Sequence, residues 1–184
     1  MIRNMVAGYA LVDALVADRI DLFAMGNLKH WLELNTTVLC GTDPVERAEY
    51  ARHRQTTERR FYEEPDGGIR DLVEWYQGRD GESVWMRAAG LYVRLLSRPQ
   101  LFVEGNHRTG ALAISYILLG GDEPPFVLTP DNAVTYFDPS TVIKNIEKQG
   151  LAMRFRSPGL TRQLASFLAE HADRKYLLPQ PRVS

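Results

Sequence analysis

The sequence contains almost no cysteine, and this absence limits the kinds of site it can build. Cys40 is the single cysteine among 184 residues. A disulfide framework and a thiolate metal cluster both need several cysteines, so the sequence excludes both. His-x-x-x-His and Cys-x-x-Cys spacings are missing as well, so we expect no transition-metal site. A lone thiol fits a reducing compartment, and we expect a cytoplasmic protein.

Long apolar runs and an excess of charge of one sign are also missing. The longest apolar run, residues 111–119, is too short to span a bilayer, and residues 1–13 lack the apolar core of a secretory signal. The formal net charge is −1, which gives no electrostatic reason to expect nucleic acid or an anionic membrane as a partner. We therefore expect a soluble protein with neither partner.

What the sequence does contain is ordinary globular composition with helical periodicity. Hydrophobic residues make up 45% and charged residues 24% of the chain. The spacing of apolar residues predicts helices over residues 5–16, 20–39, 44–60, 69–77, 82–97, 106–119, 138–148 and 160–172. A long connection is expected over residues 123–136. We predict an all-α fold in which residues 1–176 form one domain and residues 177–184 form a loose tail.

Residues 61–69 interrupt the helical series. The run Asp66-Gly67-Gly68 is a strong turn signal, and the residues on either side of it are compatible with a short β-hairpin. A plain loop between two helices accounts for the same residues equally well. Both interpretations stay open at this point.

The segment with the clearest chemistry is the loop of residues 98–110. It turns at Gly105-Asn106 and opens an apolar helix, which we expect Asn106 or Gly105 to cap. The unpaired backbone N–H groups and the dipole of such a helix start attract anions, and Arg108 adds a cation whose planar fork suits phosphate. Glu104 supplies a hard oxygen ligand for Mg²⁺ beside that phosphate. A purely structural interpretation is also open, in which Asn106 caps the helix and the charges are solvated.

The loop resembles the signature loop of the Fic/Doc (Fido) family. That family's pattern is His, any residue, Phe, any residue, Asp or Glu, Gly, Asn, Gly or Lys, Arg, and commonly Thr-Gly followed by a second Arg. The matching positions in this sequence are Phe102, Glu104, Gly105, Asn106, Arg108, Thr109 and Gly110. The resemblance implies a helical fold and, most often, transfer of AMP from ATP to a hydroxyl of a protein target.

The resemblance also implies roles for individual residues. Glu104 is the expected Mg²⁺ ligand, and the expected phosphate-binding residues are Gly105, Asn106, His107, Arg108, Thr109 and Gly110. In this family a hairpin flap precedes the loop and holds a segment of the protein target by strand addition. Residues 61–69 stand at the position of that flap.

Three positions depart from the family pattern, and two of them, Gln100 and His107, are the candidate catalytic residues. The family's catalytic His is replaced by Gln100, whose amide cannot accept a proton near neutral pH, so general-base catalysis worth about 10²–10⁴-fold is expected to be lost. The second Arg is replaced by Ala111. His107 stands at the variable position, where it is either a lysine-like cation, a displaced general base or a space-filling side chain.

Three hypotheses about function follow. The first is a Fic-like protein that binds ATP, another nucleotide or a phosphorylated small molecule but is impaired in AMP transfer. The second is an active nucleotidyl- or phosphoryl-transferase whose altered chemistry uses His107 or a group from the flap. The third is a non-catalytic helical interaction domain in which the loop is a relic.

Overall fold

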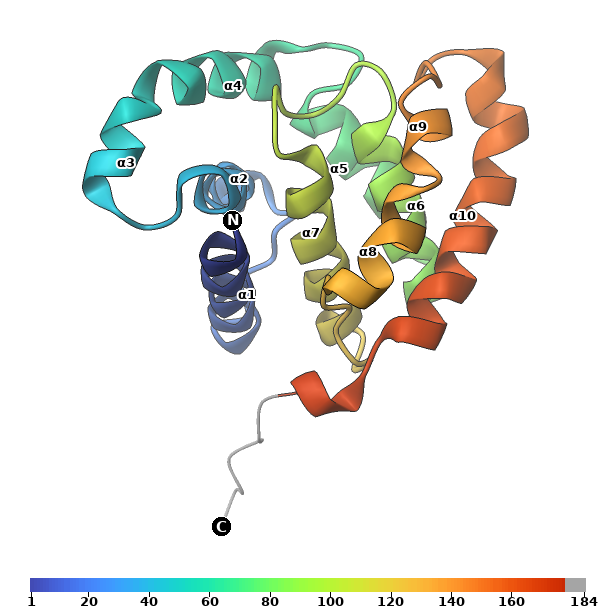
Figure 1. The fold of residues 1–184 in the computed structure, drawn as a ribbon. Helices are drawn as coiled ribbons and strands as arrows, with labels where there is room; N and C mark the ends of the chain where they lie inside the picture. The colour runs from blue at the N-terminus through green and yellow to red at the C-terminus, as the bar shows by residue number, and fades with distance from the viewer. Residues whose placement is uncertain (178–184) are drawn as a thin grey trace.

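A computed structural model describes residues 1–177 as an assembly of helices (Figure 1). In chain order these are α1 (Ile2–Ala17), η1 (Met25–Asn27), α2 (Lys29–Cys40), α3 (Pro44–Glu49), α4 (Ala51–Glu63), α5 (Ile69–Gln77), α6 (Val84–Leu96), α7 (Asn106–Gly120), α8 (Pro130–Phe137), α9 (Ser140–Ile143), α10 (Leu151–His171) and η2 (Arg174–Tyr176). The all-α prediction is confirmed. Over residues 1–177 the only β-type pairing is an isolated bridge between Arg98 and Glu147.

Helix α7 is the centre of the molecule. It packs against α1 and α2 on one side and against α6 on the other, and α10 lies along α6 (Figure 1). The small residue Gly110 permits the close approach of α6, because a Cβ atom there would lie 2.7 Å from Cδ2 of Tyr92. Apolar side chains from every α-helix except α3 form one continuous core around α7. This packing fixes the start of α7, where the candidate loop ends.

Several helix boundaries differ from the predicted ones. The charged segment predicted as one helix over residues 44–60 is divided at Tyr50 into α3 and α4. The connection predicted over residues 123–136 contains α8, whose N-terminus is closed by a capping box between Thr129 and Asn132. The last helix begins at Leu151 rather than at residue 160, and it continues through Pro158.

Residues 61–69 do not form the β-hairpin that was one of the two interpretations of the sequence. Helix α4 runs to Glu63 and α5 starts at Ile69, so the Asp-Gly-Gly turn joins two helices. The Gly68 N–H closes this turn by donating to the carbonyl of Glu64 at 3.0 Å. Phe61 is fully buried and stacks on Phe102 with ring centroids 5.7 Å apart, which keeps the end of α4 on the core. A protein target held by strand addition at residues 61–69 therefore has no structural basis.

Helices α3 and α4 form an arch at one side of the molecule (Figure 1). No residue of α3 is buried, and α4 buries only Thr57 and Phe61. Arg47 ties α3 to α2 through an ion pair with Glu33 at 2.7 Å. Arg60, which lies near the C-terminal end of α4, donates a hydrogen bond to the carbonyl of Gln100 at 2.9 Å. The arch thus touches the candidate loop directly.

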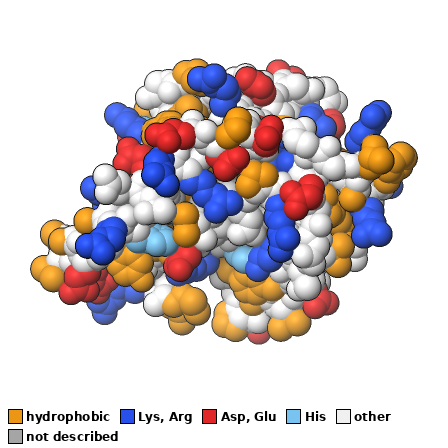
Figure 2. Space-filling model, turned by 90° about the horizontal axis from the view of Figure 1, so that it is seen from above, with side chains coloured by type: hydrophobic (Ala, Val, Ile, Leu, Met, Phe, Trp, Pro, Cys, Tyr) orange, Lys and Arg blue, Asp and Glu red, His pale blue; other side chains and the backbone are white. Residues whose placement is uncertain are grey.

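The surface shows no dominant charge. Seen from above, acidic and basic side chains are interspersed over the visible face (Figure 2), in keeping with the net charge of −1. Among residues 1–177, none of the helices combines the length and the apolar character needed to cross a lipid bilayer. The loose tail predicted for residues 177–184 lies outside the described residues, apart from Leu177.

Candidate functional site

The candidate site is the loop between α6 and α7 together with the first turn of α7. Gly105 is the N-cap residue of α7 and has a left-handed backbone with φ of 76°, and the Thr109 N–H donates to its carbonyl at 2.9 Å. A side chain at position 105 would be strained by this φ, and its Cβ would lie 2.8 Å from Nδ2 of Asn35. Glycine is therefore required at position 105 for two independent reasons.

Of the two predicted caps, Gly105 is the N-cap residue, whereas Asn106 is the first residue within α7 and its side chain turns back into the loop. Its Oδ1 accepts from the Phe102 N–H at 2.9 Å, and its Nδ2 donates to the Phe102 carbonyl at 2.8 Å. Nδ2 also reaches Oε1 of Gln100 at 3.3 Å. Asn106 is buried, so these bonds satisfy backbone groups that water does not reach. The residue acts as a clamp that closes the loop.

Gln100 is held in place at both ends of its amide. Nε2 donates to the carbonyl of Leu96 at 3.2 Å, while Oε1 accepts from Asn106. Gln100 also lines a shallow cavity of about 430 Å³ with the basic residues Arg60, Arg98 and Lys144. An amide cannot take up a proton, and this one is engaged in the structure of the loop. Its observed role is positioning.

His107 turns away from the loop and packs between α6 and α8. Its Nδ1 is hydrogen-bonded to the hydroxyl of Tyr92 at 2.8 Å, and the edge of its ring meets Phe137 at a centroid distance of 5.2 Å. Burial, with a smaller contribution from Lys144, lowers the pKa of His107 to about 4. The imidazole is therefore neutral at pH 7, which argues against a lysine-like cation and makes it a weak general base.

Arg108 reaches the last turn of α2. Its Nη1 donates to the carbonyl of Val38 at 2.6 Å, so the guanidinium complements the negative end of that helix. The side chain is half-buried, and no acidic partner pairs with it within residues 1–177. A fork with five N–H donors keeps donors for a second acceptor after one bond to a carbonyl. The guanidinium of Arg108 is thus fixed beside the C-terminal end of α2.

Glu104 presents an exposed carboxylate, and its backbone is anchored to α2. Its carbonyl accepts from Nδ2 of Asn35 at 2.9 Å, and the same nitrogen lies 3.1 Å from Oγ1 of Thr109. No cluster of three or more metal-ligating side chains occurs in the described part of the chain. One carboxylate still fits Mg²⁺, which is often held by one or two carboxylates together with water and the phosphates of a ligand.

Asn35 is a site residue that sequence reasoning missed. It is buried in α2 and joins the loop to the first turn of α7 through the two bonds just described. A signal was present in the sequence, because position 35 falls on the same helical stripe as Trp31, Leu34 and Val38, which are all fully buried. A polar residue on an apolar stripe indicates a buried hydrogen-bond partner.

The remaining predicted residues complete the first turn. Thr109 and Gly110 are buried behind the loop, as expected for the turn that supports it. The N–H groups of Asn106, His107 and Arg108 find no acceptor within residues 1–177, since the first helical bond is made by Thr109. Ala111, at the position of the family's second Arg, is fully buried and leaves no solvent-exposed place for a long cation. The donors present are those that an anion would use.

Comparison of this chain with known protein families, with curated proteins and with solved structures finds no match.

The buried imidazole predicts a pH effect on stability. Because His107 is neutral in the folded protein down to a pKa of about 4, while the unfolded chain takes up a proton near 6.5, stability should fall as the pH is lowered from 6.5 to 4. We expect this residue to account for about 1–2 kcal/mol of the loss, after allowance for the exposed part of the ring. Urea unfolding of the wild type and of His107→Gln at pH 7, 5.5 and 4.5 measures it. Equal acid sensitivity in both proteins would contradict the assignment.

Proposed function

We propose that this protein is a Fic-like protein that binds a nucleotide or another phosphorylated small molecule at the start of α7. The observation that carries the proposal is the set of three unpaired N–H groups, from Asn106 to Arg108, at the positive end of a buried central helix. Arg108 of the same turn would supply a cation through the guanidinium N–H groups that do not contact Val38, and the exposed carboxylate of Glu104 would share a Mg²⁺ ion with the bound phosphates.

The rigidity of the loop supports a binding role. Gly105, the Asn106 clamp and the two bonds of Asn35 fix the backbone before any ligand arrives. Donors that are already oriented lose little conformational entropy when a ligand binds, so the affinity is not reduced by ordering the loop. The all-α fold and the opening of α7 at Asn106 are both features that a Fic-like chain requires.

The same geometry argues for impaired AMP transfer. A transferase of this type needs a base that takes the proton of the attacking hydroxyl, and Gln100 has no such capacity. His107 is the histidine nearest to Gln100 in the sequence. Its imidazole is hydrogen-bonded to Tyr92 and has a pKa of about 4. When Mg²⁺ is bound it neutralises phosphate charge, but the chain's own residues only bind and orient the ligand. We therefore infer a binding or regulatory protein with at most weak transferase activity.

The test is a calorimetric titration with ATP, ADP, GTP and CDP-choline, each with and without Mg²⁺. We expect saturable binding of at least one of them, weakened about tenfold or more by Arg108→Gln, because a charge-assisted hydrogen bond is lost. Glu104→Gln should remove the Mg²⁺ dependence and leave the Mg²⁺-free affinity unchanged.

Arg162→Gln, an exposed arginine on α10, is the matched control and should bind as the wild type does. Absence of binding for all four ligands, or equal affinities of Arg108→Gln and Arg162→Gln, would overturn the proposal and favour a relic loop. Strong labelling of protein by radiolabelled ATP would instead favour an active transferase.

A further inference from the structure

A second feature of the molecule lies apart from the loop: a cleft of about 570 Å³ between the first half of α10 and helices α5 and α6. None of the residues from Glu104 to Arg108 lines it. Its walls include the apolar side chains of Trp75, Met86, Val93 and Met153. The volume falls within the range of pockets that hold small organic ligands, and such pockets combine apolar walls with a few charged groups.

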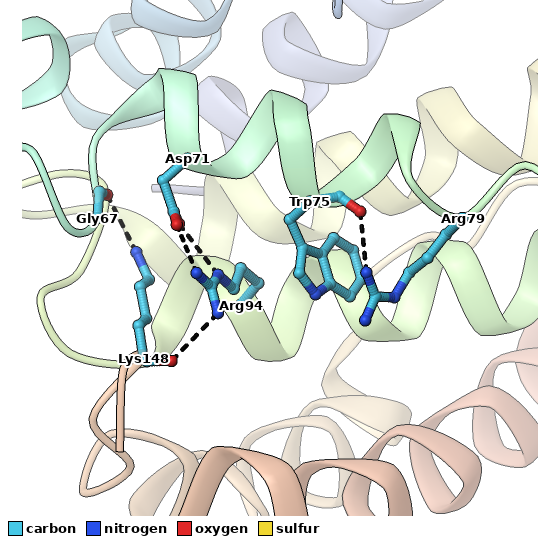
Figure 3. A network of polar contacts seen from close by, with 6 residues as sticks. All are labelled: Gly67, Asp71, Trp75, Arg79, Arg94 and Lys148. Carbon is cyan, nitrogen blue, oxygen red and sulfur yellow. Dashed lines mark hydrogen bonds and ion pairs between the residues drawn. The ribbon is translucent and has the colours of Figure 1, made fainter. Parts of the chain in front are cut away.

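One wall of the cleft is rigid. The ring edge of Trp75 lies against Gly90, where a Cβ atom would approach Cη2 of the indole to 2.6 Å. The guanidinium of Arg79 lies over the indole ring, 4.0 Å from the ring centroid. Arg79 also donates a hydrogen bond to the Trp75 carbonyl at 3.0 Å (Figure 3). The indole and the cation are therefore held as one preformed surface.

Positive charge exceeds negative charge around this cleft. Its lining contains Arg79, Arg94, Lys148 and Arg154 but a single acidic residue, Glu82. Arg94 is neutralised by a two-pronged ion pair with Asp71, and Arg79 lies 3.5 Å from Glu82. Arg154 has no ion-pair partner within residues 1–177. A concave site with uncompensated positive charge attracts anions.

Lys148 lies at the buried end of the polar network that borders the cleft. Its Nζ donates to the carbonyl of Gly67 at 3.0 Å, and its own carbonyl accepts from Arg94 (Figure 3). The residue is only 3% exposed, and burial lowers its pKa to about 7. A negative charge brought into the cleft would offset part of this unfavourable burial.

We propose that the cleft between α10 and helices α5 and α6 binds a small organic anion, with an apolar body against Trp75 and a carboxylate or phosphate head group at Arg79 and Arg154. Arg79 is preformed on the indole, and Arg154 is an exposed lining cation that has no ion-pair partner within residues 1–177. Carboxylate and phosphate share the chemistry that an arginine fork recognises, so the two head groups are separated by experiment.

The experiment uses the whole protein and three probes with the same aromatic body: benzoate, phenyl phosphate and the neutral benzyl alcohol. Binding is followed by protein-observed NMR, with Trp75→Phe used to assign the indole signal. We expect at least one anion to bind with a Kd of about 10 mM or tighter, and at least tenfold more tightly than benzyl alcohol. The anion that binds identifies the head group.

A matched pair of variants locates the site. Arg154→Gln should weaken anion binding about tenfold, whereas Arg156→Gln, an exposed arginine on the same helix that does not line the cleft, should leave it unchanged. Because the Trp75 indole signal reports on the cleft and not on the start of α7, this result is independent of the proposed nucleotide site. Equal binding of benzyl alcohol, equal effects of the Arg154 and Arg156 variants, or no binding of either anion would overturn the proposal.

Discussion

Replacing Arg94 with methionine should lower the free energy of unfolding by about 3–5 kcal/mol, the cost typical of leaving one partner of a buried ion pair unpaired. The side chains of Arg94 and Asp71 are only 11% and 14% exposed. Nε of Arg94 lies 3.0 Å from Oδ2 of Asp71, and Nη2 of Arg94 makes a second contact with Oδ1. Nη1 of Arg94 also donates a hydrogen bond to the carbonyl of Lys148 at 3.3 Å. Chemical denaturation with urea at pH 7 provides the measurement.

Two controls make this result specific. The double variant Asp71→Leu with Arg94→Met removes both charges and should recover most of the loss, since neither member of the pair is then left as an unpaired buried charge. Asp80→Asn breaks the exposed ion pair with Arg87, in which Asp80 is 80% exposed, and should cost about 0–1 kcal/mol. A loss for Arg94→Met no larger than that for Asp80→Asn would show that the buried pair contributes little.

The second large effect is expected at Asn106. Asn106→Leu keeps the approximate volume but leaves the Phe102 N–H and carbonyl buried without partners, so we expect a loss of about 2–4 kcal/mol. Asn145→Leu is the matched control, because Asn145 makes a similar bond to the Thr141 carbonyl at 2.9 Å but is exposed. That change should cost less than about 0.5 kcal/mol. Thermal unfolding of both variants decides the matter, and similar losses would contradict a clamping role.

Local signals explain which helices could be predicted from the sequence. Helix α5 has the predicted bounds of residues 69–77, because Gly68 and Gly78 flank it on both sides. The start of α7 at Asn106 was also predicted, since Gly105 supplies the left-handed residue that precedes it. In both cases the residues that set the boundary lie within the segment itself.

Tertiary packing explains what could not be predicted. The Asp-Gly-Gly signal fixes where the chain turns, but the extension of α4 to Glu63 accompanies the packing of Phe61 on Phe102, a residue far along the chain. Pro158 normally ends a helix, yet α10 passes through it. Within the candidate site, the residue types of the loop could be assigned from the sequence. The direction of the His107 side chain could not, because it depends on contacts with Tyr92 and Phe137, which lie outside the loop.

The arch of α3 and α4 has a consequence for hydrogen exchange. With Thr57 and Phe61 as its only buried residues, the arch can open as a local unit at a free energy well below that of global unfolding, so its amides should exchange faster than those of α7. Nε2 of His53 and Oγ1 of Thr57 are buried there and have no hydrogen-bond partner among residues 1–177, and opening would hydrate both. Because Arg60 on the same helix holds the Gln100 carbonyl, each opening also releases one support of the loop.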